Sequence, residues 1–169
     1  MIRHFKSADE TTTKAGGKAA VRKTVEGIIA DIEERGDVAV RALSEKFDGW
    51  APASFRLSDG DIAATMAAVP QGTLDDIRFA QDQIRNFARI QRAAMQDVEV
   101  ETQPGVILGH KNIPIAKVGC YIPGGRYPMV ASAHMSIATA KTAGCAKVIA
   151  CTPPLNGKAH PETIAAMHL

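Results

Sequence analysis

The sequence predicts an α/β protein whose first half is helical and whose strands occur only in the second half. Apolar residues recur at helical spacing from residue 18 to about residue 95, and the pattern then changes to one typical of strands. Further along, a strand, a helix and a second strand follow one another, which is the order of a βαβ unit with two parallel strands. We therefore expect a helical region at residues 1–97 and the beginning of an α/β domain at residues 98–169.

Two helices are predicted at the start of this region. Residues 18–34 carry apolar side chains at helical spacing, and Gly36 ends the helix. Asp37 is expected to cap the next helix, which ends at Gly49.

Two further helices follow. Ser58 with Asp61 resembles a capping box that opens a short helix, and Thr73 with Asp76 repeats the signal before a long helix. The long helix spans about residues 74–95 and has one broad apolar face. We interpret its arginines as a solvated face rather than an anion-binding groove. They are Arg78, Arg85, Arg89 and Arg92.

The sequence of the second half predicts a β-hairpin followed by a βαβ unit. The hairpin turns at Pro104 and Gly105, and a buried strand follows at about residues 115–122. A helix at about 130–143 leads to a second buried strand, which two prolines end. A last helix begins near Pro161 and reaches Leu169 without a stop signal. Because a parallel sheet of two strands is too small to be covered and stable alone, we expect the chain to be truncated within an α/β fold.

Composition narrows the class of protein. The 169 residues carry a formal net charge of +2, with 46% hydrophobic and 22% charged residues. This balance gives no reason to expect a nucleic-acid or membrane partner. No apolar stretch reaches the roughly 20 residues of a membrane span, and no secretory signal is visible. We expect a cytoplasmic protein in which Cys120, Cys145 and Cys151 are buried free thiols.

A glycine pair marks the junction between the first βαβ strand and its helix. Gly124 and Gly125 permit left-handed backbone angles and close approach of a ligand, and a helix N-terminus behind them would favour a phosphate. The usual nucleotide-binding fingerprints are absent. On the residues alone, a ligand loop and a plain strand-to-helix turn stay equally open.

Several segments together resemble one enzyme family. They are "ERGDVAVRALSEKFDG", "QPGVILGHKNIPIAKVG" and "VGCYIPGGRYPMVASAHMSIATAKTAGCAKVIACTPP", and they occur in this order. They resemble the histidinol dehydrogenase family over roughly residues 20–155. The resemblance implies an α/β fold with incomplete Rossmann-like (aldehyde dehydrogenase-like) domains.

The resemblance also implies an activity. Family members are homodimeric, zinc-containing enzymes that use NAD to oxidise a small-molecule alcohol through an aldehyde to a carboxylate. The tyrosine before the glycine pair contacts the cofactor in the family, and it corresponds to Tyr121 here. We also expect Gly124 and Gly125 to bind the cofactor, because a glycine allows the backbone to approach a ligand closely. This chain is expected to be the N-terminal part of such an enzyme.

No catalytic or metal-binding residue is assigned in this chain. The family's zinc ligands and its Glu-His acid/base pair lie in the later part of the full-length enzyme, and nothing here matches them. The five histidines show no ligand spacing. They are His4, His110, His134, His160 and His168. An alternative function is therefore that of a catalytically inactive remnant or a binding-only protein.

Arg126 departs from the family pattern, in which small residues follow the glycine pair. An arginine beside a ligand cleft favours an anion, whereas histidinol is a cation. The sequence "GGRYPMVASAHM" is more similar to paralogues such as sulfopropanediol dehydrogenase. A substrate-binding Arg126 is one hypothesis, and a surface charge or a contact to cofactor phosphates has equal weight.

Overall fold

The computed structural model describes residues 15–124 and 126–169. The chain divides into two compact units, Met1–Pro52 and Ala53–Leu169. The second unit thus contains helices as well as strands, and its limit differs from the division expected at residue 97. Whether residues 1–97 form a separate functional region stays a prediction.

The described part of the first unit consists of the two predicted helices. They are α1 (Ala15–Arg35) and α2 (Asp37–Asp48). Gly49 ends α2 in the left-handed conformation, and its N–H donates to the Glu45 carbonyl. The predicted cap at Asp37 is wrong, because Gly36 holds the capping position and no side-chain cap bond is made. Asp37 is instead the first helical residue, where its negative charge suits the positive end of the helix.

The second unit begins with α3 (Asp59–Ala68) and α4 (Gln71–Ala93). The capping box at the start of α3 is confirmed, since the Ser58 side chain accepts from the Asp61 N–H and the Asp61 carboxylate accepts from the Ser58 N–H. The predicted cap at Thr73 is wrong. Pro70 already precedes the helix in an extended conformation, so α4 begins at Gln71 and Thr73 lies within its first turn.

The predicted hairpin is confirmed. It consists of β1 (Val98–Gln103) and β2 (Val106–His110), which pair antiparallel. Gly105 has a φ of 81°, which explains the glycine in this tight turn. Every residue of both strands is exposed.

The βαβ unit is also confirmed. β3 (Lys117–Tyr121) and β4 (Lys147–Cys151) are parallel, with Lys117 opposite Lys147 and Tyr121 opposite Cys151. The connecting helical run contains α5 (Val130–Ala133), a central π-helical segment at His134–Ala138 and α6 (Thr139–Thr142). The chain then reaches α7 (Pro161–His168).

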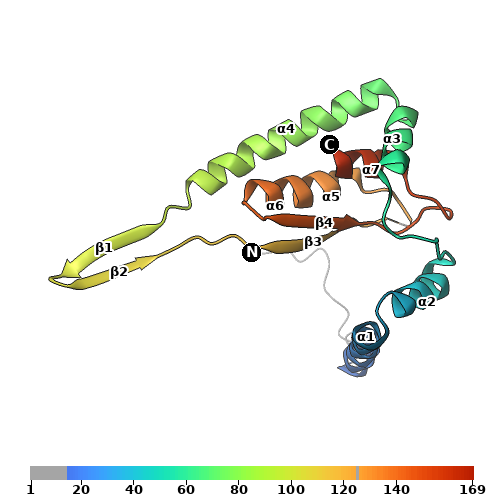
Figure 1. Cartoon of the computed structure of the whole chain (residues 1–169), viewed down its shortest axis with the longest axis horizontal. Helices are drawn as coiled ribbons and strands as arrows, with labels where there is room; N and C mark the ends of the chain where they lie inside the picture. Colours follow the sequence, from blue (N-terminus) through green and yellow to red (C-terminus); the bar gives the residue numbers. More distant parts are fainter. Residues whose placement is uncertain (1–14, 125) are drawn as a thin grey trace, which may run out of the picture. The chain divides into compact units, whose positions relative to one another are not determined.

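Described helices of the second unit cover one face of the two strands. Figure 1 shows α5, α6 and α7 along one side of β3 and β4, with α4 outside them. The core lies between these layers. It includes Val69, Leu74, Ile77, Cys120, Ile122, Ala133, Ala165 and Ala166. On the opposite face of the sheet Tyr121, Ile149 and Cys151 are exposed, so the prediction of two buried strands holds for one face. The three cysteines are free, but only Cys120 is buried.

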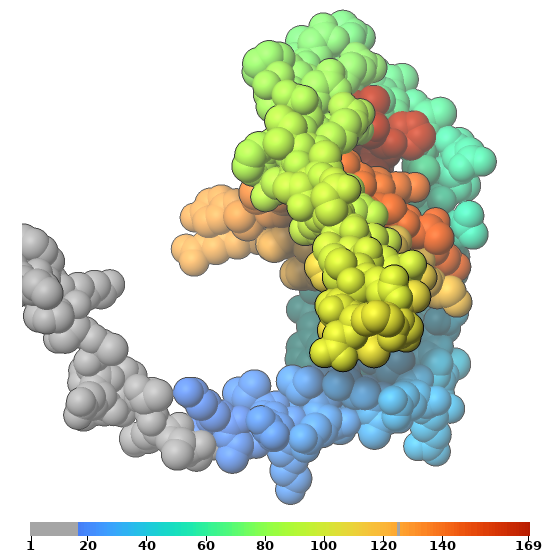
Figure 2. Space-filling model, turned by 90° about the vertical axis from the view of Figure 1, so that its left-hand side faces the viewer, coloured from blue at the N-terminus to red at the C-terminus, as the bar shows by residue number. Residues whose placement is uncertain are grey.

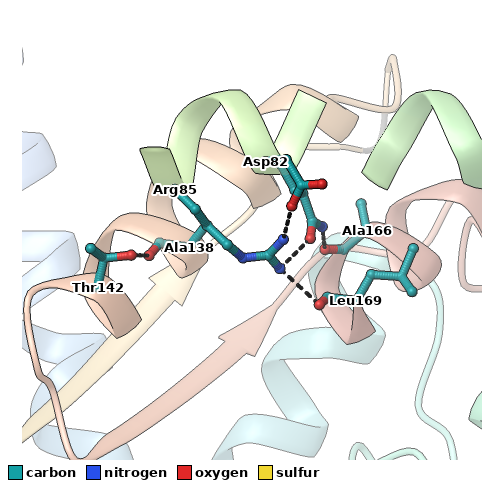
Figure 3. Close-up of polar contacts among 7 residues, drawn as sticks. Asp82, Arg85, Ala138, Thr142, Ala166 and Leu169 are labelled. Atoms are coloured by element: carbon teal, nitrogen blue, oxygen red, sulfur yellow. Dashed lines mark hydrogen bonds and ion pairs between the residues drawn. The ribbon is translucent and has the colours of Figure 1, made fainter. Parts of the chain in front are cut away.

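Polar side chains of α4 fix the end of α7 (Figure 3). Gln81, which is 2% exposed, donates from Nε2 to the Ala166 carbonyl at 2.9 Å. Arg85 donates to the Leu169 carbonyl at 2.9 Å. These bonds supply partners for carbonyls at the end of a helix, which lack partners within the helix. Arg85 is therefore partly buried and structural. Arg92 is also partly buried, whereas Arg78 and Arg89 are exposed as predicted.

Candidate functional site

The last residue of β3 and the residue that follows it differ in exposure: Tyr121 is exposed and Ile122 is buried. Ile122 is completely buried, and its N–H donates to the Cys151 carbonyl at 2.8 Å, which extends the pairing with β4. Tyr121, one residue earlier, lies on the uncovered face of the sheet with 63% of its surface exposed. The predicted cofactor-binding tyrosine thus lies at the carboxyl edge of a parallel strand, where α/β proteins commonly bind ligands.

Gly124 is closely packed against the segment that follows β4. A side-chain Cβ at this position would lie 3.2 Å from Thr152 Oγ1 and 3.3 Å from Pro153 Cγ. Gly124 does not have a positive φ, so the expectation of a left-handed angle at this residue is wrong. The close contact of Gly124 is thus with other atoms of the protein, and its contact with a cofactor stays a prediction. Gly125 lies outside the described residues.

Arg126 and Tyr127 continue the same loop and are both exposed. The Arg126 N–H donates to the Gly124 carbonyl at 3.0 Å, which closes a tight turn. Its guanidinium carbon lies 5.5 Å from the centre of the Tyr127 ring, within the range of a cation–π contact. No ion pair between described residues involves Arg126. The loop therefore presents a positive charge that no carboxylate of the described structure neutralises.

The four histidines that the structure describes are not arranged as a metal site. No group of three or more His, Cys, Asp or Glu side chains in residues 15–124 and 126–169 is arranged to hold a metal ion. His160 instead caps α7 by accepting from the Thr163 N–H, and His110 contacts the Gln96 carbonyl. His4 lies outside the described residues. The expected zinc ligands elsewhere in a longer protein stay a prediction.

His134 is an unexpected feature of the second unit. It lies in the π-helical segment, is 5% exposed, and its Nδ1 has no hydrogen-bond partner. Burial, and then the positive charge of Arg85, lower the pKa of His134 below its ordinary value. The residue lines a cavity of about 130 Å³ together with Gln81, Arg85 and Lys141. A lone histidine among small residues gave no sequence signal for this arrangement.

The described helices provide no membrane crossing, because none combines sufficient length with sufficient apolar character. The observed elements define an α/β protein in which Tyr121, at the end of β3, and Arg126, in the loop that follows, are exposed. The sequence model for histidinol dehydrogenase matches residues 11–169. The chain belongs to the histidinol dehydrogenase family, and the predicted resemblance is confirmed.

Individual relatives agree with this assignment. The chain is 54% identical over 168 residues to a histidinol dehydrogenase homolog of Shouchella clausii, covering 99% of this chain and 40% of the relative. It is 44% identical over 169 residues to sulfopropanediol 3-dehydrogenase of Ruegeria pomeroyi, covering 99% of this chain and 38% of the relative. The chain therefore spans about two fifths of these proteins.

A solved structure supports the mixed α/β fold. The crystal structure of histidinol dehydrogenase from Elizabethkingia anophelis superposes with a TM-score of 0.79 at 27% sequence identity. The match covers 98% of this chain and 36% of that one. The prediction of a mixed α/β class is confirmed, and the assignment to incomplete Rossmann-like domains stays a prediction.

Proposed function

We propose that this chain is the N-terminal part of an NAD-dependent, zinc-containing, homodimeric dehydrogenase that oxidises an alcohol through an aldehyde to a carboxylate. Family membership supports the dehydrogenase class. The observation that carries the proposal for this chain is the exposure of Tyr121, the last residue of β3, and of Arg126 in the loop that follows, at the carboxyl edge of the parallel strands. This chain would supply part of the cofactor cleft.

The exposed Tyr121 fits a cofactor contact. Its ring lies on the uncovered face of the sheet, so an extended ligand could pack against it without displacing core residues. NAD, when bound, supplies the hydride acceptor for the oxidation. Gly124, three residues further along, packs closely on Thr152 and Pro153, which follow β4. The described residues do not fit zinc, and we assign no step to them through the metal.

Arg126 favours an anionic alcohol as the substrate. Its guanidinium is exposed, stacks on Tyr127 and has no carboxylate partner among the described side chains. A guanidinium of this kind can bind a sulfonate or carboxylate through two parallel hydrogen bonds. The relative named sulfopropanediol 3-dehydrogenase supports an anionic diol in place of the cationic histidinol.

Steady-state kinetics of the longer protein tests this proposal. Arg126→Ala should raise KM for an anionic diol and lower kcat/KM about ten- to hundredfold, with NAD affinity nearly unchanged. Arg126→Lys should restore only part of the loss, because a lysine lacks the planar fork. Arg89→Ala, which removes an exposed arginine from α4, is the matched control and should behave as wild type.

Each other outcome has a definite meaning. A fall in NAD affinity with every substrate would place Arg126 on the cofactor phosphates. Unchanged constants would make it a surface charge and would remove the reason for preferring an anionic diol over histidinol. Absence of NAD reduction with any alcohol would contradict the proposed dehydrogenase itself.

A further inference from the structure

The loop between β4 and α7 contains a tight turn at Asn156 and Gly157. The flanking residues Leu155 and Lys158 exchange backbone hydrogen bonds of 2.8 and 3.2 Å and form an isolated antiparallel bridge. Asn156 has a φ of 53° and Gly157 has a φ of 70°. Positive φ at both central residues is characteristic of a type I′ turn, for which Asn-Gly is a preferred sequence. The turn thus explains why these two residues stand side by side.

Both amide groups at the centre of this turn are accessible. Asn156 and Gly157 are exposed, and the Asn156 side chain makes no hydrogen bond with another described residue. The Gly157 N–H likewise donates to no described residue. A Cβ added to Gly157 would have nothing within 4 Å, so this position is uncrowded. The Gly157 nitrogen and the Asn156 side-chain amide are therefore available for reaction.

An asparagine followed by a glycine can react within the chain, and asparagine is one of the thermolabile residues. The Gly157 nitrogen attacks Cγ of Asn156, so that an N–Cγ bond forms and the Cγ–Nδ2 bond breaks. The side-chain nitrogen leaves as ammonia together with the proton of the Gly157 nitrogen. Water then opens the resulting cyclic imide at either of its carbonyls and leaves aspartate or isoaspartate. Water is the only co-reactant, and nothing is oxidised or reduced.

The other asparagines of the chain, Asn86 and Asn112, lack these conditions. They belong to α4 and to the segment after β2, which lie on the side of the second unit shown in green and yellow in Figure 2. The backbone N–H that follows Asn86 is bonded within α4. Asn112 donates from Nδ2 to the Gln96 carbonyl at 3.0 Å and to Asp97 Oδ1 at 3.2 Å. It is also followed by the β-branched Ile113, whereas a glycine places no side chain beside the attacking nitrogen.

We propose that Asn156 is a site of spontaneous deamidation, at which this turn is converted to aspartate or isoaspartate. Ring closure requires the Asn156 backbone to rotate out of the turn conformation. The two bonds between Leu155 and Lys158 oppose this rotation, but so short a hairpin opens readily. Isoaspartate adds a methylene group to the backbone, and either product adds a negative charge to the loop that follows β4. The proposal is independent of the proposed dehydrogenase activity.

Peptide mapping by mass spectrometry tests this proposal on the 169-residue chain. After incubation at mildly alkaline pH, the peptide that contains Asn156 should gain the mass difference between an amide and an acid. It should then separate into an aspartate form and an isoaspartate form. Peptides that contain Asn86 and Asn112 should stay unchanged over the same period. The rate should rise with pH, because the attacking nitrogen must lose its proton.

Two variants and the unfolded chain serve as controls. Asn156→Gln should stay unmodified, because the longer side chain closes a ring much more slowly. Ile113→Gly creates a second Asn-Gly pair at a hydrogen-bonded asparagine, which should react more slowly than Asn156 in the folded chain and equally fast in urea. Asn156 that stays intact in the folded chain, while the chain in urea is converted, would overturn the proposal. So would aspartate without isoaspartate, which indicates direct hydrolysis, or equal conversion of the wild-type Asn112.

Discussion

Packing, and not an unusual backbone angle, explains the glycine at position 124. An alanine Cβ there would lie 3.2 Å from Thr152 Oγ1 and 3.3 Å from Pro153 Cγ, so both neighbours would have to move by a few tenths of an ångström. We expect Gly124→Ala to lower the free energy of unfolding by about 1 kcal/mol, and Gly124→Val by more. Urea titration measures both. Gly119→Ala, where nothing lies within 4 Å of the added Cβ, is the control and should not destabilise the protein.

The buried His134 should make stability depend on pH. Its pKa is lower in the folded chain than its ordinary value of 6.5, first because of burial and then because of Arg85. Arg85, Lys141 and His168 line the same cavity, and no Asp or Glu side chain is among the described residues that line it. Unfolding below pH 6.5 therefore takes up a proton that the folded state resists. The contribution of His134 is fully present above that pH and is lost as the pH falls toward its folded pKa.

Urea titration from about pH 7.5 to about pH 5.5 measures this effect. The free energy of unfolding should decrease on acidification, and His134→Leu should reduce the slope because it removes the titrating group. His110→Gln, which replaces an exposed histidine, should keep the wild-type slope. Equal slopes in wild type and His134→Leu would show that proton uptake at His134 does not govern acid stability.

At the level of whole elements, α4 holds α7 through polar bonds as well as apolar packing. Gln81→Leu would leave the Ala166 carbonyl without its partner in a buried position, and we expect a cost of about 1–3 kcal/mol. Thermal unfolding should therefore occur at a lower temperature. Gln83→Leu, on the exposed side of the same helix, is the control and should change stability little. If both variants were equally stable, apolar packing alone would hold α7.

The sequence predicted which segments are helical more reliably than it predicted where each helix begins and which of its sides is buried. Ser58 was identified as a cap because its local pattern determines the capping geometry. Thr73 carries the same pattern, but Pro70 starts α4 earlier. The long helix was predicted to have one broad apolar face, yet the structure buries Ala88 and Gln81 on α4 and leaves Phe87 61% exposed. The side chains on α7 that select the buried face are distant in sequence, so periodicity alone does not reveal them.

The strands show the same limit. Apolar composition correctly predicted β3 and β4 and their parallel pairing, but it could not tell one covered face from two. The loop that follows β3 was located from its glycines; Tyr121 is the last residue of β3, Arg126 lies in the loop, and the binding roles of both residues stay predictions. The contact of Gly124 with Thr152 and Pro153 could not be foreseen, because it joins segments nearly thirty residues apart through the fold.

At the scale of the whole molecule, the apolar surface that remains exposed indicates incomplete coverage. Tyr121 and Ile149 lie on the open face of β3 and β4, and Val100 and Leu108 lie on the open face of the hairpin. Exposed apolar patches of this kind are typical of surfaces that another chain or domain covers. The open face of β3 and β4 carries the proposed cofactor contact, Tyr121.

Catalysis should therefore require more than these 169 residues. The residues that the structure describes contain no set of side chains able to hold a metal, and the chain spans 40% of the Shouchella clausii relative. We expect no NADH formation by the purified chain with histidinol or dihydroxypropanesulfonate when NAD and zinc are supplied. Absorbance of NADH measures this, and the longer protein under the same conditions is the positive control. Turnover above the rate without enzyme would show that this chain contains a complete active site, against the proposal that it supplies only part of the cofactor cleft.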